Sequence, residues 1–196
     1  MVELWLVRHG QTDWNLDKRY QGQTDIPLNA AGLSQAYELG HTLAGTAFDA
    51  IFCSDLQRAR QTAQILAGQL NAPVYEDARL REAHFGEWEG YPYFEMKEKY
   101  PQIWMERKQN PLAPVAPGGE TLQQVAQRMS SAADHIAARF PGGRALVVAH
   151  GLSLAALRLA ADEQQERPLN EAYSLIMDNA HPLVIQWEAH NREGAA

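Results

Sequence analysis

The hydrophobic positions of the chain follow two alternating patterns. Short apolar runs over residues 2–7, 48–54 and 145–149 predict buried strands. Between and after them, apolar residues three or four apart predict helices that begin at Asn29 and that span 55–70, 119–139 and 152–161. Strands that alternate with helices favour an α/β fold with three layers, in which helices cover both faces of a mostly parallel sheet.

Three stretches depart from this alternation. Residues 13–28 are polar and irregular, which is typical of a functional loop. Residues 85–104 carry seven aromatic side chains and precede a loop rich in proline and glycine, so we expect a substrate-covering insert over about 84–119. The apolar runs 173–177 and 183–187 predict a terminal hairpin, and the tail from Glu188 is polar.

Length and composition limit the function classes. A chain of 196 residues suits one domain over 1–196, and its net charge of −7 argues against a nucleic-acid partner. A single cysteine, Cys53, excludes an internal disulfide framework, and no apolar run reaches membrane-spanning length. We expect a soluble, cytoplasmic protein with no membrane partner, whose oligomeric state has no signature in the sequence.

Two histidines occupy equivalent places at the ends of apolar runs. Arg8-His9-Gly10 follows the first run, and His150-Gly151 follows the run that ends at Ala149. Ligands of open α/β sheets bind at the carboxyl ends of strands, where Arg matches phosphate and His serves as nucleophile or proton carrier. An Arg-His pair in an ordinary strand-to-loop turn is the alternative explanation of the first motif.

Four stretches taken together resemble the histidine phosphatase superfamily, the phosphoglycerate-mutase-like fold. Besides Leu-Val-Arg-His-Gly at 6–10 and Val-Val-Ala-His-Gly at 147–151, the segment 54–63 is similar to the family's Ser-x-Leu-x-Arg-Ala-x-Gln-Thr pattern. The segment 80–90 is similar to its acidic segment. The order is the family's, and within the family the likeness is to broad-specificity phosphatases and α-ribazole phosphatase.

The resemblance implies a role for each motif residue. His9 would attack phosphorus and become a phosphohistidine, and Glu82 would act as general acid and base. Arg8, Arg58 and His150 would supply positive charge without a metal or other cofactor. A two-His, one-Glu set can also bind metal, but two arginines at the same site would repel a cation. The expected substrate contacts are Asn15, Gln21, Gly22 and Gly151.

The position after Glu82 separates two activities within the family. Mutases carry Arg there, whereas this chain has Ala83, and they tend to be longer. The sequence therefore predicts a phosphatase for a small phosphorylated metabolite such as a phosphosugar, phosphoserine, phosphoglycerate or α-ribazole phosphate. Cofactor-dependent phosphoglycerate mutase and a catalytically inactive phospho-ligand-binding protein are the alternatives.

Two further expectations concern the surroundings of the site. The aromatic side chains of Trp88, Tyr91 and Phe94 would face the leaving group and favour apolar or ring-bearing substrates. The loop positions of His84 and His181 allow either side chain to reach the pocket, whereas Arg60 would serve as a solvated or scaffold residue.

Overall fold

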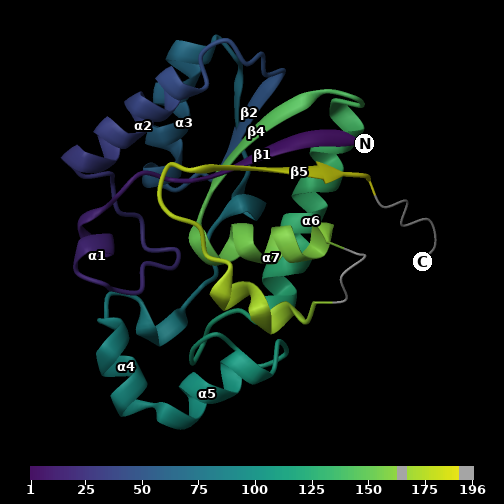
Figure 1. The fold of residues 1–196 in the computed structure, drawn as a ribbon. Helices are drawn as coiled ribbons and strands as arrows, with labels where there is room; N and C mark the ends of the chain where they lie inside the picture. Colours follow the sequence, from purple (N-terminus) through teal and green to yellow (C-terminus); the bar gives the residue numbers. More distant parts are fainter. Residues whose placement is uncertain (163–166, 190–196) are drawn as a thin grey trace.

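A computed structural model describes residues 1–162 and 167–189. Its strands form one sheet in the order β3-β2-β4-β1-β5, all parallel except β5 (Figure 1). The strands are β1 (Val2–Arg8), β2 (Ala50–Cys53), β3 (Val74–Glu76), β4 (Arg144–Ala149) and β5 (Pro182–Trp187). The helices are α1 (Asp13–Leu16), α2 (Ala30–Thr42), α3 (Gln57–Leu70), α4 (Tyr93–Lys99), α5 (Pro101–Gln109), α6 (Leu122–Arg139) and α7 (Gly151–Ala161).

Helices cover both faces of the sheet, as the alternation predicted. Leu4 and Leu6 of β1 join the core beneath α6 and α7, while Val7 joins a second core beneath α2 and α3. Successive side chains of a strand point to opposite faces, which explains this division. Figure 1 shows the resulting three layers, with α2 and α3 on one side of the sheet and α6 and α7 on the other.

The predicted terminal hairpin is wrong. Residues 169–174 form a 3-10 helix, η3 (Leu169–Ser174), and β5 pairs antiparallel with β1 instead. In the first run, Tyr173, Leu175 and Met177 pack against the core without forming a strand, and Ala172 just before them is fully buried. Of the polar tail expected from Glu188, residues 190–196 lie outside the described part of the chain.

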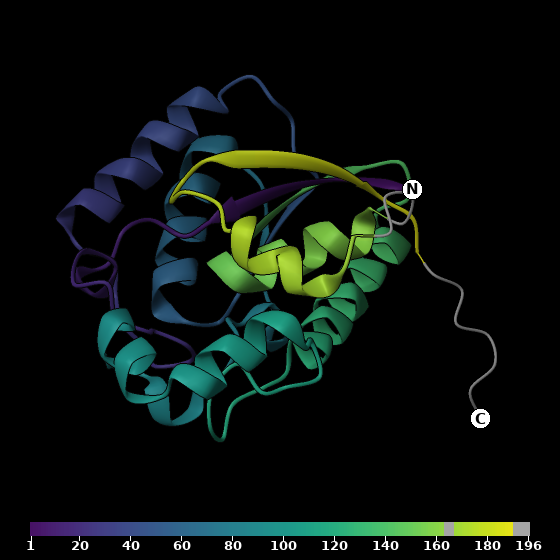
Figure 2. The ribbon, with the colours of Figure 1, turned by 60° about the horizontal axis from the view of Figure 1, so that its bottom comes forward.

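The aromatic segment forms a separate layer near the carboxyl ends of the parallel strands. Its helices α4 and α5 follow the short 3-10 turns η1 (Ala78–Leu80) and η2 (Gly86–Trp88), and both views show them grouped away from the sheet (Figures 1 and 2). The buried ring of Trp88 packs near Tyr20 of the 13–28 loop, with ring centroids 5.5 Å apart. The loop and the insert therefore share one aromatic core.

Over the described residues, no helix combines the length and the apolar character that crossing a membrane requires. Cys53 is fully buried, and burial raises the pKa of its thiol to about 12. A thiol in that state is protonated at neutral pH and therefore chemically inert.

Candidate active site

The two motif histidines meet at one edge of the sheet. β1 and β4 are parallel neighbours in which Arg8 pairs with Ala149, so His9 and His150 follow equivalent strand positions. Their ring centroids lie 5.1 Å apart, and both residues are buried. The strand pairing thus brings together two side chains that are 141 positions apart in the sequence.

The hydrogen bonds of His9 define its tautomer. Its Nδ1 lies 2.6 Å from the carbonyl oxygen of Gly10, which can only accept, so Nδ1 carries the proton and Nε2 is a bare lone pair. Burial lowers the pKa of His9 well below 6.5, and the charges of Arg58 and Arg8 lower it further. The ring is therefore neutral at pH 7 and retains the lone pair that a nucleophile needs.

Arg58 contacts both the second histidine and the 13–28 loop. Its Nη1 and Nη2 donate to the carbonyl oxygens of Thr24 (2.8 Å) and Gly22 (2.7 Å). Its Nε donates to Nδ1 of His150 (3.2 Å). Burial lowers the pKa of Arg58 to about 10, which leaves the guanidinium charged at neutral pH.

The bond from Arg58 also determines the tautomer of His150. Since Nδ1 accepts that bond, a neutral ring carries its proton on Nε2. This Nε2 is buried and has no hydrogen-bond partner among the described residues. Burial, followed by the charge of Arg58, lowers the pKa of His150 well below 6.5, so the ring is a neutral donor next to His9.

Arg8 and Gly151 lie close together beside the histidines. Arg8 Nη1 donates to the carbonyl oxygen of Met177 (2.8 Å), whereas its buried Nε has no partner in the described part of the chain. A Cβ on Gly151 would approach Ile176 to 2.9 Å and the Arg8 guanidinium to 3.5 Å. Glycine at the start of α7 therefore permits the close packing of Arg8 against this helix.

Glu82 points its carboxylate at the amino end of α7. Oε1 accepts from the amides of Ser153 and Ala83 (both 2.9 Å), and Oε2 accepts from the amide of Leu152 (3.1 Å). Free N–H groups and the helix dipole favour a carboxylate there. These bonds hold the acid beside the strand end that carries His150.

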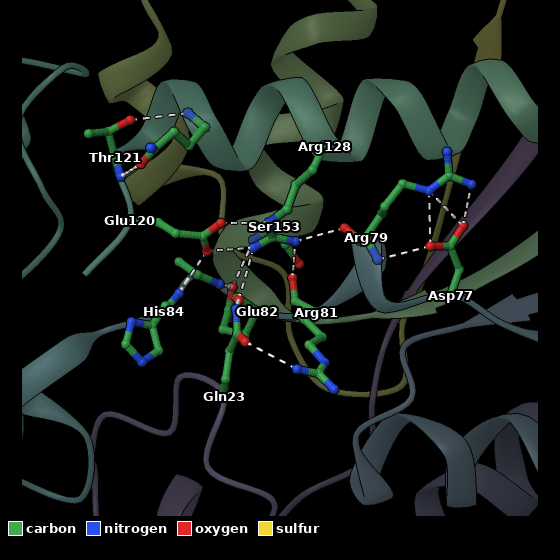
Figure 3. Close-up of polar contacts among 12 residues, drawn as sticks. Gln23, Asp77, Arg79, Arg81, Glu82, His84, Glu120, Thr121, Arg128 and Ser153 are labelled. Carbon is green, nitrogen blue, oxygen red and sulfur yellow. Dashed lines mark hydrogen bonds and ion pairs between the residues drawn. The ribbon is translucent and has the colours of Figure 1, made fainter. Parts of the chain in front are cut away.

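The backbone that carries Glu82 is itself fixed by Arg128 of α6. Figure 3 shows the Arg128 guanidinium between Glu120 and the chain leading to Glu82. Its Nη2 donates to the Glu82 carbonyl oxygen (2.9 Å) and its Nη1 to that of Arg81 (2.5 Å), while Nε bonds Glu120 (2.9 Å). Arg128 thus neutralises the charge of Glu120 and anchors the backbone of Glu82.

The 13–28 loop brings three of the predicted contacts to the same place. Asn15, Gln21 and Gly22 all line the cavity described below, although Asn15 also accepts from the amide of Thr12, the N-cap of α1, and Gln21 accepts from the Thr12 hydroxyl. Gly22 has a φ of +53°, and a Cβ there would collide with Glu89. This conformation turns the Gly22 carbonyl toward Arg58, which explains why the loop carries glycine.

These side chains surround a cavity of about 610 Å³. Arg8, His9, Arg58 and Glu82 line it together with the loop contacts and Gly151, whereas His150 lies behind the lining, in contact with His9. All nine residues predicted from the sequence therefore come together at this one place.

Of the other side chains that the sequence predicted near the cavity, only some line it. Phe94 lines the wall, but Trp88 is buried in the core and Tyr91 lies outside the lining. His84 and His181 do not line the cavity either; they lie next to Glu89 and the Asn179 carbonyl, respectively. Arg60 lies 3.9 Å from Glu76 at the surface, as a scaffold residue would.

Several residues at the site were not predicted. Asn179 donates to the His9 carbonyl (2.6 Å), Thr62 accepts from the Gly10 amide (3.1 Å), and Arg128 holds the Glu82 backbone. Asn179 lies in Asp178-Asn179-Ala180-His181-Pro182, whose turn-forming residues indicated only a loop. In the described ranges, no group of three or more His, Cys, Asp or Glu side chains is arranged to hold a metal ion.

Comparison with known proteins identifies similar chains. The sequence model of the histidine phosphatase superfamily (branch 1) matches residues 4–194. The chain is 37% identical to the uncharacterized phosphatase PhoE of Bacillus subtilis (strain 168) over 157 residues. This match covers 80% of this chain and 76% of PhoE. It is 37% identical over 159 residues to the probable phosphoglycerate mutase GpmB of Klebsiella pneumoniae subsp. pneumoniae, with coverages of 80% and 73%. The solved structure of Bacillus stearothermophilus YhfR superposes with a TM-score of 0.86 at 35% identity, over 96% of this chain and 92% of YhfR.

Proposed function

The chain belongs to the histidine phosphatase superfamily, and from that premise we propose that it hydrolyses small phosphomonoesters through a phosphohistidine on His9. The observation that carries the proposal is the state of His9: a buried, neutral ring whose Nδ1–H donates to the Gly10 carbonyl oxygen, so that its Nε2 carries the lone pair. Phosphoryl transfer requires an in-line nucleophile and positive charge around the phosphoryl oxygens, and Arg8 and Arg58 supply that charge.

The donors around His9 suit a phosphoryl group. Arg8 Nε–H and His150 Nε2–H are both buried donors without partners in the described residues, and both neighbour the His9 ring. Leaving buried donors unpaired is costly, and phosphoryl oxygens would satisfy them. The same donors stabilise the negative charge that spreads over these oxygens in the transition state.

The reaction balances with Glu82 as the proton carrier. In the first step, His9 Nε2 forms a bond to phosphorus, the bond to the leaving oxygen breaks, and Glu82 gives that oxygen its proton. In the second step, a water oxygen attacks phosphorus, the N–P bond breaks, and Glu82 takes the proton of the water. The products are the alcohol and inorganic phosphate, and the proton that Glu82 takes up in the second step replaces the one that it gives in the first.

The choice of phosphatase over mutase rests on the residue after Glu82. Ala83 is fully buried, so this position carries no charged side chain toward the cavity. GpmB, with its name of probable phosphoglycerate mutase, keeps the mutase as the second candidate. Product analysis separates the two, because a phosphatase releases inorganic phosphate whereas a mutase returns the phosphoryl group to phosphoglycerate.

The test is trapping of the phosphoenzyme. Wild-type protein quenched during turnover of para-nitrophenyl phosphate should carry an acid-labile phosphoryl group on His9. His9→Ala should abolish both label and turnover while the fold persists, and His181→Ala, at an exposed histidine outside the cavity, should retain both. Label on another residue, or near-native turnover of His9→Ala, would contradict the assignment. Absence of turnover with tight phosphate binding would instead favour an inactive phospho-ligand-binding protein.

A further inference from the structure

More cationic side chains line the cavity than a single phosphoryl group needs. Five cationic side chains line it, and Glu82 is the single acidic residue of the lining within the described chain. Arg8 and Arg58 lie beside the two histidines and account for the phosphoryl group. Three cations remain in a protein whose net charge is −7: Lys97, Arg107 and Lys108.

These three cations gather around one indole ring. Lys108 Nζ lies 3.9 Å from the centroid of the Trp104 ring, Lys97 Nζ lies 5.3 Å from it, and Arg107 Cζ lies 5.4 Å from it. Like charges so close repel one another. Burial lowers the pKa of Lys108, and the charges of Arg107 and Lys97 lower it further. Cation–π attraction offsets part of this repulsion, but it does not neutralise the charge.

Arg107 is the most informative member of the cluster, since it is 4% exposed and forms no ion pair with a carboxylate in the described residues. It donates to the Tyr20 hydroxyl (2.8 Å) and the Val115 carbonyl (3.2 Å), and its Nε has no partner among the described residues. Buried charges in proteins are ordinarily paired or bind a ligand. A buried, unpaired guanidinium beside a cavity therefore indicates that an anion completes the site.

Two tyrosines connect this cluster with the catalytic end. Tyr93 lines the same wall. Burial raises the pKa of its hydroxyl, and the charges of Arg8, Glu82 and Arg107 also contribute to that pKa. Tyr173 also lines the cavity, lies 5.2 Å from the Arg107 guanidinium, and has a buried hydroxyl without a hydrogen-bond partner in the described part of the chain. One substrate can therefore contact the histidines and the cations through the same cavity.

We propose that Lys97, Arg107 and Lys108 form a second anion subsite, and that the preferred phosphomonoester carries a carboxylate or a second phosphate on its leaving group. The proposal rests on the proposed phosphatase function and specifies its substrate class. It replaces the expectation of apolar leaving groups, because the wall that presents Phe94 also presents three cations. The aromatic rings position the cations rather than select an apolar substrate.

Matched substrates test the subsite. 3-Phosphoglycerate and glycerol 3-phosphate differ by a carboxylate in place of a hydroxymethyl group, and fructose 1,6-bisphosphate against fructose 6-phosphate tests a second phosphate. We expect kcat/KM to favour the doubly anionic member of at least one pair by about tenfold or more, as for a hydrogen bond to a charged group. The pair that shows the preference identifies the anion.

Variants assign that preference to the cations. Lys97→Gln combined with Lys108→Gln should lower kcat/KM for the preferred doubly anionic substrate about tenfold more than for its partner. Lys99→Gln removes the same charge from α4 outside the lining and should leave the ratio unchanged. Arg107→Lys tests the buried position, with thermal unfolding as the check that the variant folds.

The outcomes separate this proposal from the proposed function. Hydrolysis of para-nitrophenyl phosphate without preference within either pair would overturn the subsite and leave the phosphatase intact. Equal losses on both members of a pair in the double-lysine variant would assign the lysines to structure and also overturn the subsite. Absence of phosphate release from every monoester would overturn the phosphatase itself.

Discussion

At the scale of single residues, the site depends on two histidines that the fold keeps uncharged. His9 and His150 are buried beside arginines, and the pKa of each lies well below the value of 6.5 expected in the unfolded chain. The unfolded state therefore binds protons that the folded state does not bind as the pH falls below 6.5. Stability must decrease in that direction, because protons stabilise the state that binds more of them.

We expect the free energy of unfolding to fall by about 2 kcal/mol between pH 6.5 and 5.5, about 1 kcal/mol for each histidine. This interval lies above the range in which carboxylates with ordinary pKa values titrate. Urea unfolding at both pH values measures the loss, and His9→Asn should show about half of it. A free energy that stays constant across this interval would contradict the neutral state of the two rings.

Arg128 illustrates a residue that acts at a distance from the substrate. It does not line the cavity, yet it bonds the carbonyl oxygens of Arg81 and Glu82. Arg128→Ala should lower kcat about 10–100-fold by misplacing the Glu82 carboxylate, with less effect on KM. Arg79→Ala, at a neighbouring arginine whose side chain pairs with Asp77 instead of Glu120, is the control. A change in KM alone would contradict a positioning role.

At the scale of elements, the sequence predicted what depends on local pattern. The period of apolar residues located β1, β4, α2 and α7, and the Asn29 cap marked the start of α2, because these signals act within a few residues. The short helix α1 was missed, since it lies in the stretch 13–28 that was predicted to be irregular. The contacts of Asn179 and Arg128 could not be predicted, since they join segments distant in sequence through the folded chain. The hairpin prediction was wrong for the same reason, because β5 pairs with β1, a strand distant from it in the sequence.

Besides their shared aromatic core, a carboxylate of the insert joins it to the loop. Glu89 accepts from the amides of Gln23 (3.0 Å), Thr24 (2.9 Å) and Phe85 (3.0 Å), and from the Thr24 hydroxyl (2.6 Å). It thereby supports the loop whose carbonyl oxygens hold Arg58. The sequence match to the acidic segment included Glu89 but gave no sign of this role.

Glu89→Gln should destabilise the fold by about 1–3 kcal/mol, because an amide nitrogen replaces one of the accepting oxygens. It should also lower kcat/KM as Arg58 loses its support. Glu87→Gln, two positions away on an exposed side chain, provides the matched control. Chemical unfolding and steady-state kinetics measure both effects, and equal behaviour of the two variants would refute the bridging role of Glu89.

At the scale of the whole molecule, an acidic protein concentrates cations in one cavity. Both Arg8 and Arg58 line this cavity, and in the proposed reaction their charge offsets that of the phosphoryl group, so we expect catalysis to require no divalent ion. Incubation with a chelator should leave kcat/KM for para-nitrophenyl phosphate within about twofold, as expected when guanidinium groups perform the electrostatic work. Loss of activity in chelator that a divalent ion restores would contradict this prediction.

The pairing of β5 with β1 has a consequence for biosynthesis. The bond from Arg8 to Met177 spans 169 positions, and the bond from Asn179 to His9 spans 170. A ribosome finishes residues 8 and 9 long before residues 177 and 179 leave its exit tunnel. Until those residues emerge, Arg8 and His9 lack the two contacts that Met177 and Asn179 provide. If His9 acts as proposed, we expect activity to arise late in synthesis, so that a partly made chain has little capacity to hydrolyse phosphomonoesters.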